Sequence, residues 1–366
     1  MDASVEETQA LLKTEQANFR HLVWDIAWFG LAFPAVGSFL SIFAIQLGAT
    51  PFELGLLSSL PSIFLLLASA LSDGWRARYA DSIKALLWPA TGMRVRLLIF
   101  ACLPFLPGEW QIPVLLAVAA LAAVPQGISS IIFLVMMREA VTDQRFTALM
   151  SRRFLALNLG LGAGTLGLGF WLERAPFPAN YQVMFVVAFG LTMVSLWHVQ
   201  QIRVISATPL PASASPSSRP WRSPEFRRLA SIVGAVFVAF FSIVPVIPLR
   251  LVHGLGASEG FVAIYGFLEL AGGATMATVA HRLIDWVGLR YTLLLGMTGT
   301  GLAAVILALA PSLYLALPAA LLSGACWTLT DISQFTFFSL NTPAESRARR
   351  TRAYFQAVSI AIFVGP

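Results

Sequence analysis

Five ionisable residues of this sequence lie inside long apolar runs, where a charge is costly. Glu269 and Asp331 are acids within two such runs. Arg94 and Arg96 are cations within a third run, and Asp25 lies in the first turn of the first run. A charge at the middle of a bilayer is strongly unfavourable unless it is paired or hydrated, so such residues often mark the path of a proton, ion or charged solute. These five side chains are therefore the first candidates for chemistry.

The depth of each acid limits its role. Glu269 lies about nine residues into its run, roughly 14 Å deep at 1.5 Å per residue. It either takes part in moving charge or has a structural partner, such as a carbonyl or an arginine. Asp331 lies about seven residues before the end of its run and is as well placed to line a cavity as to serve packing. Asp25 is shallow, and we expect water on the cytoplasmic side to hydrate it.

The two cations lie deep in one run and only two residues apart. Successive residues of an α-helix differ by about 100°, so the side chains of Arg94 and Arg96 point some 200° apart. Both therefore cannot face one cavity, and we expect one of them to serve packing or to pair with a neighbouring helix.

Two other runs carry side chains suited to a bound solute. Gln126 and Ser129 share one helical face beside Pro125, and they either hydrogen-bond a solute or hold helices together. Trp327 lies in the matching part of a later run, close to Asp331. Aromatic residues with few hydrogen-bonding partners favour a hydrophobic or amphipathic solute over a sugar.

The composition requires a membrane protein. Hydrophobic residues make up 57% of the 366 residues and charged residues 11%, against about 25% charged in soluble proteins. The mean hydropathy is +0.77. Soluble enzymes, nucleic-acid binders and disordered proteins are thereby excluded. The sequence contains no Walker motif, phosphate-binding glycine loop, metal-ligand cluster or Ser/His/Asp set, so we predict no enzyme activity, no cofactor and no metal.

The apolar runs are long enough to cross about 30 Å of hydrocarbon as helices. An eleventh run begins near Tyr354 and stops at Pro366, which predicts a chain truncated within its eleventh membrane helix. The ten complete runs lie at roughly 22–46, 53–72, 84–106, 112–136, 153–172, 181–200, 229–250, 260–280, 290–310 and 313–338.

The basic residues give the orientation. If the N-terminus is cytoplasmic and the runs alternate, all but four of the 24 Lys and Arg residues fall in cytoplasmic segments. The exceptions are Arg94, Arg96, Arg174 and Arg250. This asymmetry follows the positive-inside rule and predicts a multi-pass protein of the plasma or inner membrane. It also explains the positive net charge without nucleic-acid binding.

Two local patterns predict how helices begin and meet. Thr50, Pro51 and Glu53 form the pattern of a helix capping box, so we expect Glu53 to be structural. The run at 153–172 repeats glycines at helical spacing, including Gly160 and Gly164, which lets a neighbouring helix approach closely.

The chain contains an internal repeat. Residues 47–50 read Leu-Gly-Ala-Thr at the end of the first run, and residues 255–258 read Leu-Gly-Ala-Ser at the end of the seventh. The stretch at 206–220 is rich in proline and serine and reads as a flexible linker. We therefore predict a cytoplasmic N-terminal segment (1–21), a first six-helix bundle (22–202), a cytoplasmic linker (203–228) and an incomplete second bundle (229–366).

These features resemble the major facilitator superfamily of transporters. The loop after the second run is similar to the superfamily pattern G-x-x-x-D-R-x-G-R-R, with Asp73 as its acid and Arg76 and Arg78 as its bases, although Ser69 stands at the first glycine. The resemblance implies a gating latch in which Asp73, together with Arg76, Arg78 and Arg138, stabilises the outward-facing state. The alternative is a solvated loop acid beside lipid headgroups.

The resemblance also implies an all-α membrane fold of two pseudo-symmetric six-helix bundles, with a cavity lined by spans one, four, seven and ten. The implied function is secondary transport of a small organic solute by a monomer in the lipid bilayer. Alternating access would move the solute, efflux would be the direction for hydrophobic or amphipathic cargo, and H⁺ is the candidate coupling ion. The alternative function is that of a receptor or membrane scaffold that keeps this fold but transports nothing.

The orientation can be tested by thiol labelling. In a chain whose Cys102 and Cys326 are replaced by serine, we expect Gly108→Cys and Ser312→Cys to react with a membrane-impermeant thiol reagent outside intact cells. Ser215→Cys in the linker should stay unlabelled until the cells are opened. Outside labelling at Ser215 would invert or break the topology.

Overall fold

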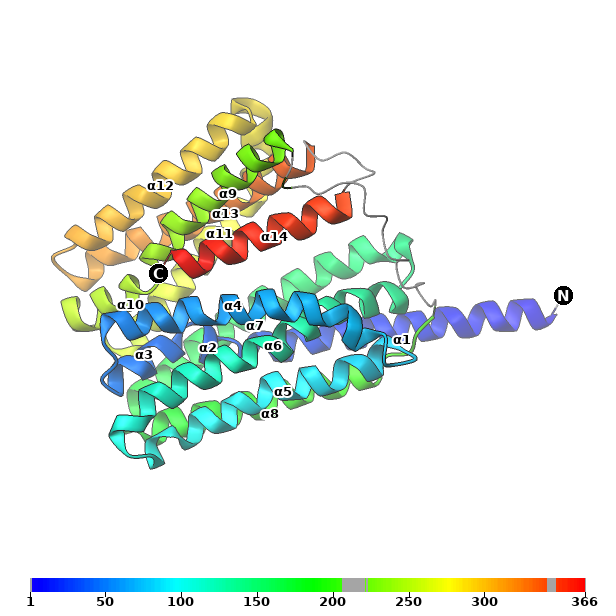
Figure 1. The fold of residues 1–366 in the computed structure, drawn as a ribbon, viewed down its shortest axis with the longest axis horizontal. Helices are drawn as coiled ribbons and strands as arrows, with labels where there is room; N and C mark the ends of the chain where they lie inside the picture. The colour runs from blue at the N-terminus through cyan, green and yellow to red at the C-terminus, as the bar shows by residue number, and fades with distance from the viewer. Residues whose placement is uncertain (1, 206–220, 222, 341–346, 366) are drawn as a thin grey trace. The chain divides into compact units, whose positions relative to one another are not determined.

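The protein is described by a computed structural model that covers residues 2–205, 221, 223–340 and 347–365. All regular elements within these ranges are helical, which confirms the predicted all-α class (Figure 1). In chain order the α-helices are α1 (Asp2–Ala32), α2 (Pro34–Gly37), α3 (Phe39–Gln46), α4 (Pro51–Arg76), α5 (Ser82–Cys102), α6 (Gly108–Ala140), α7 (Asp143–Arg174), α8 (Ala179–Gln200), α9 (Pro224–Ile243), α10 (Val246–Leu249), α11 (Glu259–Val287), α12 (Leu289–Leu309), α13 (Leu313–Leu340) and α14 (Arg347–Val364).

Nine stretches of the described residues are helical, long and apolar enough to cross a membrane. The first predicted span, 22–46, is not among them because it is divided into α1, α2 and α3. Pro34 begins α2 and has no amide hydrogen to donate, so the helix is interrupted there. The eleventh run is also absent from the nine. The helix α14 has four arginines among its first six residues, so its apolar part is too short and the whole helix too charged for a membrane-spanning stretch.

The sequence repeat is also a repeat of backbone structure. Gly48 and Gly256 both adopt left-handed conformations, with φ of +91° and +66°, which other residues rarely take. Each glycine is followed by a capped helix. The amide of Thr50 donates to Glu53 Oε2 at 2.7 Å, which confirms the capping box, and Ser258 Oγ accepts from the amide of Phe261 at 3.2 Å.

The chain divides into two compact units, each with its own core. The first unit comprises residues 1–40, 63–168 and 175–214, and the second comprises 41–62, 169–174 and 215–366. The predicted linker lies mostly outside the described residues, so its flexibility stays a prediction. Its predicted end at 228 is late, because Ser223 caps α9 and Pro224 begins it.

In the first unit, α5 packs against α6 and α8, and α1 packs against α8. The glycines of α7 allow close contact with α1, as their spacing predicts. A methyl group on Gly160 would lie 2.8 Å from the carbonyl oxygen of Ala27, and one on Gly164 would collide with the carbonyl of Leu31. The helices α1, α5, α7 and α8 are thereby held close enough for polar side chains to bridge them.

In the second unit, α11 and α12 pack against α13, and α14 packs against α9. The contact between α11 and α13 again depends on glycine. A side chain on Gly324 would collide with the carbonyl of Glu269, and one on Gly272 would collide with that of Leu321. Glu269 therefore lies where the backbones of these two helices meet.

Candidate functional site

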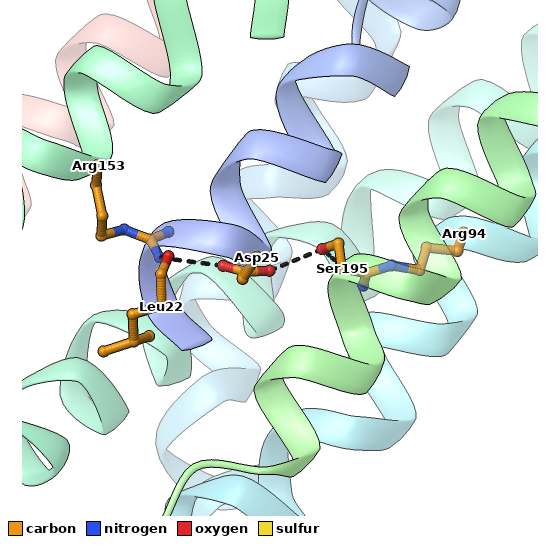
Figure 2. Close-up of polar contacts among 5 residues, drawn as sticks. All are labelled: Leu22, Asp25, Arg94, Arg153 and Ser195. Atoms are coloured by element: carbon orange, nitrogen blue, oxygen red, sulfur yellow. Dashed lines mark hydrogen bonds and ion pairs between the residues drawn. The ribbon is translucent and has the colours of Figure 1, made fainter. Parts of the chain in front are cut away.

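A buried polar network joins three helices of the first unit around Asp25 of α1 (Figure 2). Arg153 of α7 donates from Nη1 to Asp25 Oδ2 at 3.1 Å, and it also donates to the carbonyl oxygen of Leu22. Ser195 of α8 donates from Oγ to Asp25 Oδ1 at 2.7 Å. The guanidinium of Arg153 also lies over the ring of Phe133, 4.8 Å from its centre. Both oxygens of the carboxylate are thus engaged.

The structure corrects the expectation that water hydrates Asp25. Only 4% of its surface is exposed, and 6% of that of Arg153. The sequence assigned Arg153 to a cytoplasmic loop, but α7 begins at Asp143 and carries the arginine into the bundle. Ser195 was not predicted either, since a single serine in an apolar run carries no signal of its partner.

Arg94 and Arg96 point to different neighbours, as their spacing predicts. Arg94 donates from Nε to the carbonyl of Thr192 at 2.9 Å and from Nη1 to that of Ala90 at 2.6 Å. Its Nη2 donates to Ser195 Oγ at 3.2 Å, which joins Arg94 to the network of Asp25. Arg96 instead donates from Nη1 to Gln126 Oε1 of α6 at 2.9 Å.

A second ion pair lies where α4 and α6 end. Arg76 lies 3.8 Å from Glu139, whose side chain is only 2% exposed. Arg78 and Arg138 are exposed and lie over the rings of Trp75 and Phe146. The side chain of Asp73 lies outside the described residues, so the latch proposed for it stays a prediction.

The sequence missed two acids on this side of the first unit. One is Glu139, the partner of Arg76, which follows an apolar run and resembles a solvated end residue. The other is Glu15, which is 4% exposed and accepts from the hydroxyl of Thr142 at 2.6 Å. Arg145 lies 3.7 Å from Glu15. Their positions on long helices gave no sign of burial.

In the second unit, Glu269 has a neutral partner. Ser323 of α13 donates from Oγ to Glu269 Oε1 at 2.8 Å. Among the described residues, no lysine, arginine or histidine nitrogen lies within 4.0 Å of this carboxylate. The partner is therefore neither of the two that the sequence suggested.

Trp327 stacks on Phe240 of α9, with ring centres 3.6 Å apart and planes 18° apart. Both residues line a cavity of about 110 Å³ between α9, α12 and α13, together with Met297 and Thr300. Asp331, one turn further along α13, is exposed. The aromatic surface expected near Trp327 is thus present within the second unit.

Gln126 and Ser129 occupy one face of α6, as predicted. Ser129 is buried, with 6% of its surface exposed. Gln126 is half-buried and accepts from Arg96. Of the sequence candidates, the structure brings together Asp25 with Arg94, through Ser195, and Gln126 with Arg96.

Comparisons with known proteins give one consistent result. A family model described as Major Facilitator Superfamily matches residues 26–366. A bacterial homologue of the iron transporter ferroportin, solved in an inward-facing state, is 14% identical, with a TM-score of 0.70 over 95% of this chain and 91% of that one.

Two further solved structures are similar. The nucleoside transporter NupG is 10% identical, with a TM-score of 0.63 over 96% of this chain and 89% of that one. The xylose transporter XylE from E. coli is 12% identical, with a TM-score of 0.68 over 96% and 90%. At such identities the likeness shows the fold alone. No curated protein matches the sequence significantly.

The buried pair predicts strong energetic coupling. Asp25→Ala and Arg153→Ala should each lower the free energy of unfolding by about 3 kcal/mol, because each leaves an unpaired buried charge. The double variant should lose clearly less than the sum of the two. Chemical unfolding in mixed micelles measures all three. Arg152→Ala, an exposed neighbour on α7, is the control and should change little. Additive losses would show that the pair is not coupled.

Proposed function

We propose that this chain moves a small organic solute across a membrane by alternating access. It belongs to the Major Facilitator Superfamily, a family of transporters and not of enzymes. One observation carries the proposal beyond the family. Ionisable side chains are kept inside apolar, membrane-spanning helices, although each is costly there. Such residues are usually retained where charge or protons must move.

A receptor or scaffold with the same fold is the second candidate. It would need helices that pack well, and the glycine contacts supply them without any charge. Arg96 and Glu269 each form one hydrogen bond between helices, but a neutral side chain could form such a bond without an uncompensated charge. This difference favours transport.

We propose H⁺ as the coupling ion and Glu269 as the residue that carries it. A carboxylate can only accept hydrogen bonds, whereas a protonated carboxyl can also donate one. The hydroxyl of Ser323 can rotate to serve either state, because it both donates and accepts. A salt bridge to an arginine would instead hold Glu269 ionised. Asp331, which is exposed on α13, is the second candidate for this role.

The aromatic surface favours a hydrophobic or amphipathic solute, and we propose efflux as its direction. The stacked rings of Phe240 and Trp327 line their cavity with little polar surface beside them.

The positive-inside pattern supports a cytoplasmic N-terminus and the plasma or inner membrane. Arg76 and Glu139 supply the charged cluster that we assign, with Asp73, Arg78 and Arg138, to the gating latch. The chain is proposed to act as a monomer.

Proton coupling can be separated from solute binding in proteoliposomes. Glu269→Gln should abolish accumulation driven by a pH gradient, because an amide cannot take up or release a proton. It should spare counterflow exchange, which requires no net proton movement. Asp331→Asn tests the second acid in the same way.

The control variant is Glu109→Gln, which changes an exposed acid in the first turn of α6 and should accumulate solute like the parent. If both Glu269→Gln and Asp331→Asn also accumulate solute like the parent at every pH, the acids are structural and proton coupling through them is refuted.

A further inference from the structure

Arg94, Arg96 and Arg153 lie on helices of the first unit and are buried or half-buried, and they differ in how their charge is compensated. Arg153 forms an ion pair with Asp25. Arg94 has three hydrogen bonds and reaches the same carboxylate through Ser195. Both are also buried, with 5% to 6% of their surface exposed. Their charge and their donors are therefore used within the protein.

Arg96 is different. A guanidinium has five N–H donors, and Arg96 uses one of them, to Gln126 Oε1 at 2.9 Å. Among the residues that the structure describes, no carboxylate oxygen lies within 4.0 Å of it. Its side chain is half-buried, so part of it can be reached from outside the protein.

Arg96 lies too deep in its helix to pair with the headgroups at the membrane surface, where arginines of membrane proteins often find a negatively charged partner. It is the fifteenth residue of the candidate span Ser82–Phe105, whose length is 24 residues. At 1.5 Å per residue it lies roughly 14 Å from the nearer end of that span. The headgroup region begins about 15 Å from the bilayer centre, where the hydrocarbon core ends, and so lies beyond easy reach of the side chain.

Gln126 completes a set of donors. Its amide oxygen accepts from Arg96, and in the described part of the chain its NH₂ group has no hydrogen-bond partner. Gly92 of α5 packs on Pro125, with only 3.4 Å from an added methyl carbon to that ring, so the two helices are held together one turn from Arg96. The guanidinium and the amide NH₂ therefore come from two fixed helices.

We propose that Arg96 and Gln126 bind the negatively charged group of the transported solute, so that the solute is an organic oxyanion. This inference rests on the proposed transport function and names its substrate class. The guanidinium fork matches the two oxygens of a carboxylate, and it equally matches a phosphate or sulfonate. The bound anion supplies the negative charge that no described carboxylate of the protein places beside Arg96. The amide of Gln126 adds a neutral hydrogen-bond donor.

Uptake into proteoliposomes made only of phosphatidylcholine tests the charge of the solute. The labelled probes share one aromatic ring, which suits the apolar surfaces of the protein: benzoate, benzenesulfonate and phenyl phosphate are anions, benzamide is neutral and benzylammonium is a cation. We expect uptake of at least one anion and of neither other probe. Arg96→Gln should reduce the initial rate about tenfold, as expected for one lost hydrogen bond to a charged group.

Two further variants sharpen the test. Arg96→Lys keeps the charge without the fork and should fall between the parent and Arg96→Gln. Arg174→Gln changes an exposed arginine at the end of α7 and should transport like the parent. Repeating the assay with phosphatidylglycerol in the vesicles distinguishes a lipid headgroup of net negative charge from a solute, because an anionic lipid partner would compete with the probe and slow its uptake.

The outcomes separate the two proposals. Uptake of benzamide or benzylammonium that Arg96→Gln leaves unchanged would overturn the oxyanion proposal and leave transport standing. Slower uptake in phosphatidylglycerol vesicles, lost in Arg96→Gln, would assign Arg96 to lipid and also overturn it. No uptake of any probe by the parent protein would overturn the oxyanion proposal, whereas the transport function would still be decided by the gradient-driven accumulation assay.

Discussion

The carboxylate of Asp25 holds together the part of the first unit on which the candidate site depends. It lies on α1 and accepts from Arg153 of α7 and Ser195 of α8. Ser195 in turn accepts from Arg94 of α5, so four helices meet at one buried acid. In an apolar interior, removing one member leaves the others without compensation, which makes the arrangement all or none. The glycine contacts of α7 with α1 bring the backbones close enough for this to form.

The same requirement for a partner separates the structural charges from the functional ones. Arg153 pairs directly with Asp25. Arg94, whose own hydrogen-bond partners are neutral, is linked to the same carboxylate through Ser195. Glu269 has only a hydroxyl, and Arg96 has only an amide, among the described residues. A neutral partner satisfies hydrogen bonding but leaves the charge uncompensated. These two residues are therefore suited to a mobile counter-charge, a proton for the acid and an oxyanion for the arginine.

The sequence predicted the helices, but it did not predict which side chains contact one another across them. Hydropathy located the spans, and local chemistry located the cap at Glu53, because a capping box depends only on neighbours in the chain. The burial of Asp25 depends on the register of α7 against α1, which no local pattern encodes. Spacing showed that Arg94 and Arg96 diverge, but only the packed helices show which one is compensated.

The central claim is that Arg94 stabilises the fold whereas Arg96 serves a ligand. Thermal unfolding of the purified, solute-free protein measures this difference directly. Arg94→Gln should lower the apparent Tm by about 5 °C, because buried carbonyls and Ser195 lose their donor. Arg96→Gln should leave the Tm unchanged or raise it, since it removes an uncompensated charge. Equal losses of stability in the two variants would contradict the account.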